Sequence, residues 1–550
     1  MKESVDCLFI GHNEMEFDNY VKLVRSMGNN SGAYRDLNLN FIIHNNKNST
    51  PFDIYNLLKN QDEEKEKVSL LQGVSLTITY LGTFLKNKGF SIDYVNSFQD
   101  EKEELVEKLK NNNILTVIIP TTLYVAPFPI IEIIECVKKY NSNAKIILGG
   151  PYISREIKCS ESTELLISFF EYLNADVYIN SAQGETALSE AIKAIKEERE
   201  LKSIDNICYK NGNEYIINSI SEENNSLDEN MVDWNLFSDK LGKCVRVRTS
   251  ISCPFSCAFC GFPQHAGKYR LANIKTIEKE LNMINSIRTI ESVQFIDDTF
   301  NVPKERFKEL LRMMIKNKYK FKWHSHFRCQ FSDEETIKLM KEAGCEGVFL
   351  GIESGSQIIL NNMNKQVTLD KYRKGIELLN KYEIVNYASF IIGYPGETKE
   401  TIQETVNFIE ETKPTFFRTQ LWYCDTVTPI WTQKDKYKIE GSNFQWSHST
   451  MNYLEACDAI EKIFFTIKNS IWVPQYNFEF EAIFSLLHEG MSIEQVKDFI
   501  NSFDEGVREK LQNNDQYEIS DYILTRLRNA CGNKCENQEL LNKYNAEFTF

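Results

Sequence analysis

Three cysteines in one short loop are the residues of this sequence best suited to chemistry. Cys253, Cys257 and Cys260 have C-x3-C-x2-C spacing and follow residues 245–248, whose alternating basic and apolar pattern is typical of a strand. Soft thiolates at this density bind iron–sulfur clusters or zinc. A closed zinc site takes four ligands, and an ordinary 4Fe–4S cluster takes four cysteines. Three cysteines therefore predict a cluster with one iron open to a further ligand.

The loop resembles the cluster motif of the radical S-adenosylmethionine (radical SAM) enzymes. Members of this family hold a 4Fe–4S cluster on three cysteines, and the open iron binds the amino and carboxylate groups of S-adenosylmethionine. The resemblance implies that Phe259, between the last two cysteines, lies beside the adenine. The alternative is a structural zinc site completed by Cys244, His265 or a distant cysteine.

The composition indicates an ordinary globular protein of more than one domain. The chain has 550 residues, 42% hydrophobic and 26% charged, and single cores stop growing at about 250–300 residues. A net charge of −15 argues against nucleic acid as a partner. No apolar run of about 18 residues or secretion signal is evident. The fourteen cysteines are spread along the chain, so we expect a cytoplasmic protein with reduced thiols.

Strands alternate with helices through residues 1–200, interrupted by an irregular insertion at 13–71. This spacing predicts a parallel, doubly wound, Rossmann-like sheet. The expected strands are Ser4–Ile10, Ser91–Val95, Ile114–Pro120, Ala144–Gly150 and Asp176–Ile179.

Small and hydroxyl residues follow these strands, where such a sheet binds ligands. They are Thr121, Thr122, Gly149, Gly150 and Gly184. They leave room for a long cofactor tail and supply hydrogen bonds to it. The arrangement resembles the cobalamin-binding domain that precedes the barrel in a large class of radical SAM enzymes. The resemblance implies that all five residues bind the cofactor and that the first four line the groove for its nucleotide tail.

The sequence departs from many cobalamin domains at one point. Those domains carry an Asp-x-His-x-x-Gly loop whose histidine binds cobalt, whereas His12 lacks both the aspartate and the glycine. We therefore expect cobalamin to bind without a histidine on cobalt. The alternative for the whole domain is a Rossmann-like spacer that binds nothing.

After an aperiodic linker at 201–243, β/α units repeat through residues 244–432. Six strands in this rhythm predict a partial (β/α)6 TIM-like barrel with its active site at the carboxyl ends of the strands. Residues 433–550 are expected to form a mostly helical cap over the barrel mouth.

Polar residues fall at the predicted strand ends of the barrel. Asp297 and Asp298 stand where the family usually has a Gly-Gly-Glu segment contacting the methionine ammonium, and the substitution resembles the cobalamin-dependent branch. The resemblance implies that Arg328 pairs with the methionine carboxylate as a bidentate fork. Helix caps and salt bridges are the alternatives.

By the same resemblance, Glu353 suits the ribose hydroxyls, and Ile392 and Gly393 lie where the family stacks the adenine. His324 and His326 alternate on the third strand, so we expect both to point into the barrel. No catalytic residue is assigned, because barrel histidines are more often packing residues.

The opening segment, FIGHNEMEFDNYVKLVRSMG followed by SGAYRDLNLNF, resembles the group named for the P-methyltransferase of phosphinothricin-type antibiotic biosynthesis. The resemblance implies a 4Fe–4S cluster, S-adenosylmethionine and methylcobalamin as cofactors, and a flavodoxin- or ferredoxin-like electron donor. The expected reaction transfers a methyl group to an unactivated carbon or a phosphinate phosphorus of a small-molecule or peptide intermediate in natural-product biosynthesis. The alternatives are a non-methylating cyclisation or rearrangement, and a non-enzymatic cobalamin or redox sensor.

Overall fold

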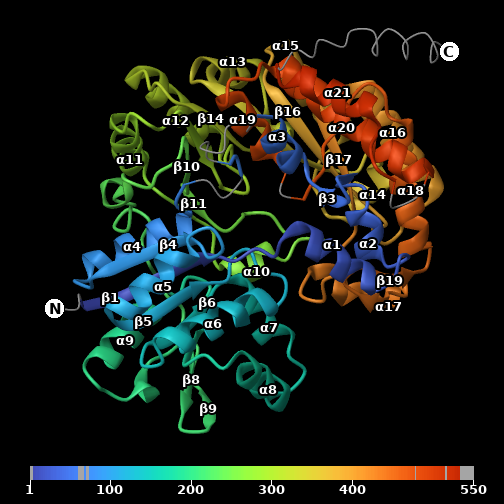
Figure 1. The fold of residues 1–550 in the computed structure, drawn as a ribbon. Coiled ribbons are helices and arrows are strands. Elements are labelled where there is room, and N and C mark those ends of the chain that lie inside the picture. Colours follow the sequence, from blue (N-terminus) through green and yellow to red (C-terminus); the bar gives the residue numbers. More distant parts are fainter. Residues whose placement is uncertain (1–3, 60–66, 70–72, 477, 514–516, 533–550) are drawn as a thin grey trace.

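The computed structural model describes residues 4–59, 67–69, 73–476, 478–513 and 517–532, and contains two parallel sheets. The first sheet lies in the blue to green part of the chain in Figure 1. Its parallel strands, in sheet order, are β4 (Ile92–Ser97), β1 (Ser4–His12), β5 (Asn113–Pro120), β6 (Lys145–Gly149) and β7 (Val177–Ile179). The chain order thus reverses between β1 and β5, which makes this the switch point of a doubly wound sheet.

Both faces of this sheet are covered by helices, as the continuous apolar strands require. Along β1, Leu8 and Ile10 pack toward α5, α6 and α8, whereas Cys7 and Phe9 pack toward α4 and α9. The helices are α4 (Leu76–Asn87), α5 (Lys102–Asn111), α6 (Phe128–Tyr140), α7 (Pro151–Cys159), α8 (Thr163–Leu173) and α9 (Glu185–Lys196). The expected α/β class of this domain is confirmed.

Part of the expected linker belongs to the first sheet. Strands β8 (Ile207–Asn211) and β9 (Glu214–Ile217) form an antiparallel hairpin on the edge of β7. Gly212 has φ +62°, the left-handed conformation that a tight hairpin turn requires. The segment was therefore wrongly expected to lack regular structure. Two 3-10 turns, η1 (Leu201–Ser203) and η2 (Trp234–Phe237), flank it.

The second sheet is a partial barrel whose strands are all parallel. In sheet order they are β10 (Cys244–Val247), β13 (Ser292–Phe295), β14 (Lys322–His326), β15 (Cys345–Glu353), β16 (Val385–Ile392), β17 (Phe416–Leu421) and β21 (Ile471–Trp472). The six expected strands are present, and β21 adds a short seventh. Five helices connect them on the outside: α11 (Ile274–Ser286), α12 (Lys304–Asn317), α13 (Glu334–Glu342), α15 (Leu369–Lys381) and α16 (Lys399–Thr412).

Helix α19 (Phe480–His488) fills the amino end of the barrel interior. The ring of Phe484 stacks on His324 with the centroids 4.3 Å apart. Gly347 permits this approach, because a Cβ there would lie 2.4 Å from the Phe484 ring. Helix α19 therefore occupies the barrel interior beside the amino-terminal parts of β14 and β15.

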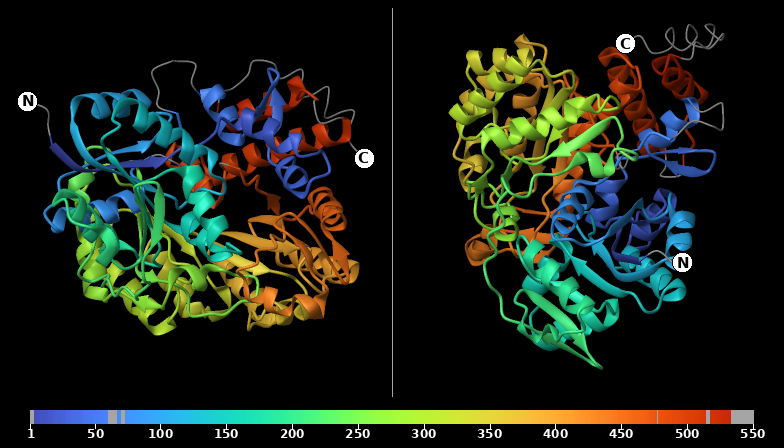
Figure 2. Two further views of the ribbon diagram at one scale, coloured as in Figure 1. Left: turned by 90° about the horizontal axis from the view of Figure 1, so that it is seen from below. Right: turned by 90° about the vertical axis from the view of Figure 1, so that its left-hand side faces the viewer.

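The insertion and the C-terminal region form one further lobe, although they lie at opposite ends of the chain. Figure 1 shows the blue α1–α3 region beside the red and orange α18, α20 and α21, and the left view of Figure 2 shows the same neighbourhood. The Nζ atom of Lys510 donates to the carbonyl oxygens of Asn38 and Phe41, both at 2.7 Å. Arg35 Nη2 lies 2.8 Å from Asp458 Oδ1. Non-local contacts thus order the described part of an insertion that was expected to be irregular.

The elements of this lobe are mostly helical, which confirms the expected character of the C-terminal region. They are α1 (Phe17–Ser26), α2 (Gly32–Leu37), β2 (Ile42–His44), β3 (Lys47–Ser49), α3 (Pro51–Lys59), α18 (Tyr453–Thr466), α20 (Ile493–Asn513) and α21 (Asp521–Ala530). Residues 533–550 lie outside the described part of the chain.

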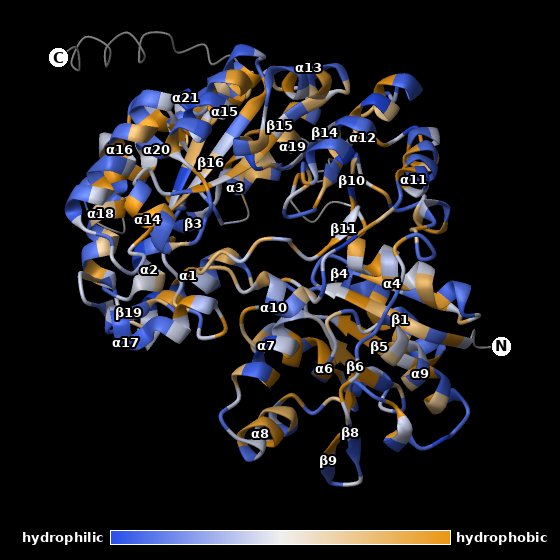
Figure 3. Cartoon of the chain, turned by 180° about the vertical axis from the view of Figure 1, so that it is seen from behind, coloured by the Kyte–Doolittle hydropathy of each residue, from blue (hydrophilic) through white to orange (hydrophobic). Residues whose placement is uncertain are grey.

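Short elements lie in the loops that follow the barrel strands. They are β11 (Ser250–Ile251), α10 (Phe262–Ala266), β12 (Arg270–Leu271), η3 (Cys329–Phe331), α14 (Gln357–Asn362), η4 (Pro429–Gln433), α17 (Lys434–Tyr437), β18 (Glu440–Ser442), β19 (Gln445–His448) and β20 (Met451–Asn452). Figure 3 shows hydrophobic residues along the strands of both sheets and hydrophilic residues along much of the helices. In the described residues, no helix has the length and apolar character to cross a membrane.

Candidate functional site

A cavity of about 1890 Å³ lies between the carboxyl ends of the two sheets. The first sheet contributes residues that follow β1, β5, β6 and β7, and the barrel contributes residues on and after β10, β13 and β14. This is the location expected for a ligand site in both fold types. A single space therefore borders both predicted cofactor sites.

Four of the five residues predicted to bind cobalamin border this cavity: Thr122, Gly149, Gly150 and Gly184. Thr121 does not; its side chain is buried and its hydroxyl donates to the Gly149 carbonyl at 3.0 Å. Gly150 has φ +122°, and a Cβ there would lie 3.0 Å from the Thr121 hydroxyl. Thr121 thus connects the ends of β5 and β6 through its hydrogen bond to Gly149. Its effect on a ligand would be indirect, through the positions of Gly149 and Gly150.

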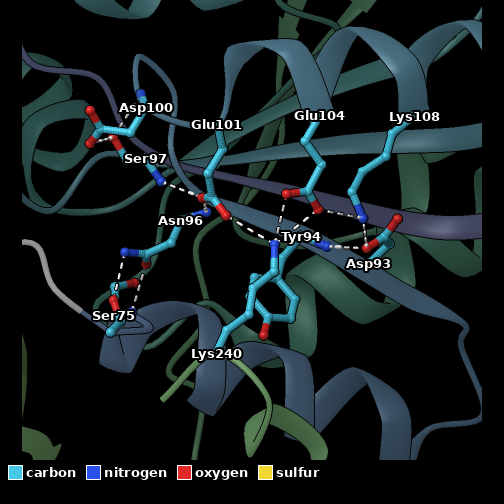
Figure 4. Close-up of polar contacts among 11 residues, drawn as sticks. Ser75, Asp93, Tyr94, Asn96, Ser97, Asp100, Glu101, Glu104, Lys108 and Lys240 are labelled. Atoms are coloured by element: carbon cyan, nitrogen blue, oxygen red, sulfur yellow. Dashed lines mark hydrogen bonds and ion pairs between the residues drawn. The ribbon is translucent and has the colours of Figure 1, made fainter. Parts of the chain in front are cut away.

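A polar network fixes the rim of the cavity at the end of β4 (Figure 4). Asn96 accepts a hydrogen bond from the Ser75 amide at 2.8 Å, and Lys240 Nζ lies 2.9 Å from Glu101 and from Glu104. Burial opposes the charge on Lys240, but hydrogen bonds to Glu104 and Glu101 raise its pKa. Because Lys240 lies just before β10, this ion pair ties the start of the barrel to α5 of the first domain.

His12 borders the cavity at the end of β1. Its ring lies against Tyr124 with the centroids 5.0 Å apart, and its Nδ1 has no hydrogen-bond partner in the described part of the structure. Burial lowers the pKa of His12, so the imidazole is neutral at pH 7. Neutral imidazole is the form that binds metals, so the expected absence of a histidine on cobalt stays a prediction.

The three cysteines of the predicted cluster lie together after the carboxyl end of β10. Burial raises the pKa of Cys260 to about 11, and the nearby Cys257, Asp298 and Cys253 add to this rise. Burial also raises the pKa of Cys253. The thiols of Cys253 and Cys260 are therefore protonated at neutral pH without a metal, and binding a metal would release their protons.

Arg328 contacts this loop directly. Its Nη2 lies 3.5 Å from the sulfur of Cys257, and its guanidinium lies 3.6 Å from the centroid of the Phe255 ring. Nη1 is buried and has no partner among the described residues. One side of the guanidinium thus rests on the loop, and the other has a donor available for a ligand carboxylate.

The geometry does not support the zinc alternative through Cys244. This residue begins β10 opposite Ser292, at the amino ends of the strands, whereas the loop follows the carboxyl ends. Within the described residues, no three His, Cys, Asp or Glu side chains are placed to hold one metal ion. A 4Fe–4S cluster does not require such a set, because each of its cysteines binds a different iron.

The two predicted aspartates differ in their surroundings. Asp297 is buried and accepts hydrogen bonds from the amide and hydroxyl of both Thr249, at 2.9 Å each, and Ser250, at 2.5 and 2.6 Å. It therefore anchors the chain that enters the cluster loop. Asp298 instead exposes its carboxyl to the cavity. Desolvation in the cavity and the neighbouring Asp297 raise the pKa of Asp298 to about 7.

Glu353 and Phe259 meet at a buried lysine that sequence reasoning missed. Lys365 Nζ lies 2.8 Å from Glu353 Oε1 and 5.3 Å from the centroid of the Phe259 ring. Glu353 has φ +68°, a left-handed conformation at the end of β15. The turn containing Lys365 carries no periodic pattern, so no sequence signal pointed to this pair.

Trp446 and His448, on β19, cover the segment predicted to stack on adenine. Ile392 is fully buried, and a Cβ on Gly393 would lie 2.4 Å from the Trp446 ring. The Gly393 carbonyl lies 3.0 Å from His448 Nε2. Neither predicted residue borders the large cavity, and their contact with adenine stays a prediction.

The two barrel histidines lie at different depths. His326 borders the cavity and packs against Phe349, with the ring centroids 5.0 Å apart. His324 lies deeper, with Nδ1 3.1 Å from Glu346 Oε1 and its ring stacked on Phe484. His324 is thus a packing residue, and only His326 is accessible to a ligand.

Residues 247–409 match the model of the radical SAM superfamily. An uncharacterized methyltransferase of Pyrococcus horikoshii is 27% identical over 50% of this chain and 59% of its own length. The anaerobic magnesium-protoporphyrin IX monomethyl ester cyclase of Cereibacter sphaeroides is 24% identical over 66% of this chain and 60% of its own length. The chain thus spans about three-fifths of the length of these curated relatives.

Two solved structures share the fold. The cobalamin-dependent S-adenosylmethionine radical enzyme OxsB, with aqua-cobalamin bound, aligns over 99% of this chain and 81% of its own, with a TM-score of 0.59 and 14% identity. The radical S-adenosylmethionine methyltransferase TsrM of Kitasatospora setae, with cobalamin and a 4Fe–4S cluster bound, aligns over 65% of this chain and 74% of its own, with a TM-score of 0.54 and 18% identity. The expected match to the radical SAM superfamily at residues 247–409 and the expected α/β fold class are confirmed.

Proposed function

We propose that this chain, which contains a radical SAM domain at residues 247–409, is a cobalamin-dependent radical SAM methyltransferase. One observation carries the proposal: the cavity bordered by Gly149 and Gly150 on the first sheet also reaches Ser252 and Asp298 beside the cysteine loop. Two cofactors could therefore act on one substrate. The methyltransferases among the relatives and the shared fold support this assignment.

The first domain suits cobalamin by its shape. Glycines at 149, 150 and 184 leave backbone open to the cavity, and a side chain at 150 would clash with Thr121. The cavity volume of about 1890 Å³ exceeds the roughly 300–1,000 Å³ of an ordinary ligand pocket. This size suits a large cofactor together with a substrate.

The barrel suits a cluster and S-adenosylmethionine by its donors. Cys253, Cys257 and Cys260 would hold the cluster, and the unpartnered Nη1 of Arg328 would donate to the methionine carboxylate. Asp298 would accept hydrogen bonds from the methionine ammonium. A nearby cation favours the carboxylate, so this ligand would lower the raised pKa of Asp298.

When bound, these groups would supply a 5′-deoxyadenosyl radical for hydrogen abstraction and a transferable methyl group. The residues of this chain contribute positioning. Asp297 anchors the entry to the cluster loop through Thr249 and Ser250. Lys365 holds the carboxylate of Glu353 in an ion pair and would position it for the proposed contact with the ribose. The proposed acceptor is an unactivated carbon or a phosphinate phosphorus of a natural-product intermediate.

A second candidate function is a non-methylating cyclisation or rearrangement on the same architecture. It is favoured by the similarity to magnesium-protoporphyrin IX monomethyl ester cyclases. Formation of S-adenosylhomocysteine in proportion to product identifies a methyltransferase. Turnover without S-adenosylhomocysteine identifies the second candidate.

An anaerobic assay tests the shared part of both functions. The reconstituted protein is reduced with dithionite and given S-adenosylmethionine, and 5′-deoxyadenosine is measured. We expect cleavage by the native chain and none by Cys257→Ala. No cleavage by the native protein with a full complement of iron would favour a cobalamin or redox sensor instead.

A further inference from the structure

A basic surface patch lies at α17 and the residue after it. It comprises Lys434, Lys436 and Lys438, all exposed. Lys434 Nζ lies 5.4 Å from the centroid of the Trp431 ring, and Lys436 donates to Gln433 at 3.3 Å. In the described part of the chain, none of the three ammonium groups forms an ion pair with a carboxylate.

The local charge is opposite to that of the whole chain. Residues 429–438 carry three lysines and one aspartate, Asp435, for a net charge of +2, whereas the chain carries −15. The neighbouring helix α14, with the sequence QIILNN, adds no acidic group. Its proximity follows from Gly396, where a Cβ would lie 2.7 Å from Asn362 Nδ2 and 3.5 Å from the Tyr437 ring.

The segment that carries the patch is bonded to the cluster loop. The amide of Ile430 donates to the carbonyl of Ala258 at 2.9 Å, and Ala258 lies between Cys257 and Phe259. Ala258 is only 4% exposed, and its own amide donates to the Met363 carbonyl at 2.8 Å. One backbone hydrogen bond therefore links the patch-bearing segment to the residue next to a cluster cysteine.

We propose that this patch is the docking site of the electron donor, a small acidic protein with a low-potential one-electron centre such as a flavodoxin. The inference rests on the proposed function, because a cluster must be present to accept the electron. In the step, the donor loses one electron and the cluster gains it, with no further reactant. The patch provides charge complementarity to an acidic partner on the segment bonded to the cluster loop, although the chain as a whole carries a net charge of −15, and this complementarity would steer the encounter.

The test is the triple variant Lys434→Glu, Lys436→Glu and Lys438→Glu, with a purified flavodoxin as the probe. Isothermal titration calorimetry at low ionic strength should show affinity weakened on the order of 10- to 100-fold, and flavodoxin-driven 5′-deoxyadenosine formation should slow by a similar factor. Dithionite-driven formation should stay within about twofold of the native rate, since that route needs no protein docking. Salt at about 0.5 M should weaken binding by the native chain and affect the variant little.

A matched control is available on the opposite end of the barrel. Lys316, Lys318 and Lys320 have the same spacing and are exposed, and they precede the amino end of β14 at Lys322. Their change to Glu alters the net charge equally and should leave flavodoxin affinity near the native value. Equal losses in both triple variants, or no loss in the first, would overturn the docking proposal.

The two proposals fail in different ways. Docking involves the surface and not the cluster, so Cys257→Ala should still bind flavodoxin with native affinity. Absence of dithionite-driven cleavage in the native chain would count against the proposed function alone. Normal dithionite-driven cleavage together with patch-independent binding would count against the docking site alone.

Discussion

The anchor that Asp297 provides leads to a quantitative prediction. Asp297→Ala removes the acceptor for the amides of Thr249 and Ser250, which are 1% and 6% exposed. Each buried unsatisfied group costs about 1–3 kcal/mol. Because Asp297 borders the cavity, water can replace part of the lost bonding. We therefore expect local opening of this segment to become easier by about 2–4 kcal/mol.

Hydrogen–deuterium exchange followed by mass spectrometry measures this opening directly. At a factor of ten per 1.4 kcal/mol, exchange in peptides covering 248–256 should accelerate roughly 30- to 1000-fold. Asp297→Asn keeps one acceptor oxygen and should show a smaller effect. The amount of iron bound after reconstitution should be lowest in Asp297→Ala and intermediate in Asp297→Asn, because a loop without its anchor holds the three cysteines poorly in position.

A second aspartate that accepts from a backbone amide supplies the control. Asp333 accepts hydrogen bonds from the amide and hydroxyl of Thr336, both at 2.7 Å, at the start of α13. Asp333→Ala should accelerate exchange in α13 and leave peptides covering 248–256 unchanged. Native exchange and native iron content in Asp297→Ala would refute the anchoring argument.

Three further variants test the site. Cys257→Ala should abolish iron binding while cobalamin stays bound, whereas Cys159→Ala should retain both cofactors. Visible absorption and iron analysis measure the two cofactors. A full 4Fe–4S spectrum in Cys257→Ala would contradict the assignment of the cluster. Because folding raises the pKa of Asp298 from 3.8 to about 7, the native state binds its proton more tightly, so its contribution to stability falls as pH rises through this interval. Asp298→Asn should therefore raise the melting temperature of the apo-protein at pH 8 but not at pH 4, and an equal shift at both would contradict this. Lys365→Met leaves Glu353 buried without its ion-pair partner and should lower the free energy of unfolding by about 3–5 kcal/mol, measured by chemical denaturation. Adding Glu353→Leu should recover much of this loss. No recovery in the double variant would contradict the stabilising role of the ion pair.

The two sheets were predictable because their signals are local. The apolar run ending in Ile118 and Ile119 specifies a buried parallel strand wherever it occurs. The spacing of the three cysteines alone likewise indicates a metal-binding loop. Such features depend on neighbours in sequence, so one chain is enough to recognise them.

The features that were missed depend on distant partners. Helix α2 is stabilised through Asn38, whose carbonyl accepts from Lys510, and neither residue carries a signal for the other. The same holds for Lys365 beside Glu353 and for Trp446 against Gly393. The hairpin at 207–217 is different, because the glycine of its turn is a local sequence signal, but the segment was assigned to the linker at 201–243.

The contact between Lys510 and Asn38 constrains how the protein is made on the ribosome. The two residues are separated by 472 positions, so the carbonyl groups of Asn38 and Phe41 must wait until residue 510 has emerged before their ammonium donor arrives. The cavity wall also includes Glu479 and Glu481, which are translated long after the cysteine loop. A cofactor held between the domains can therefore be fully enclosed only after translation has passed these residues.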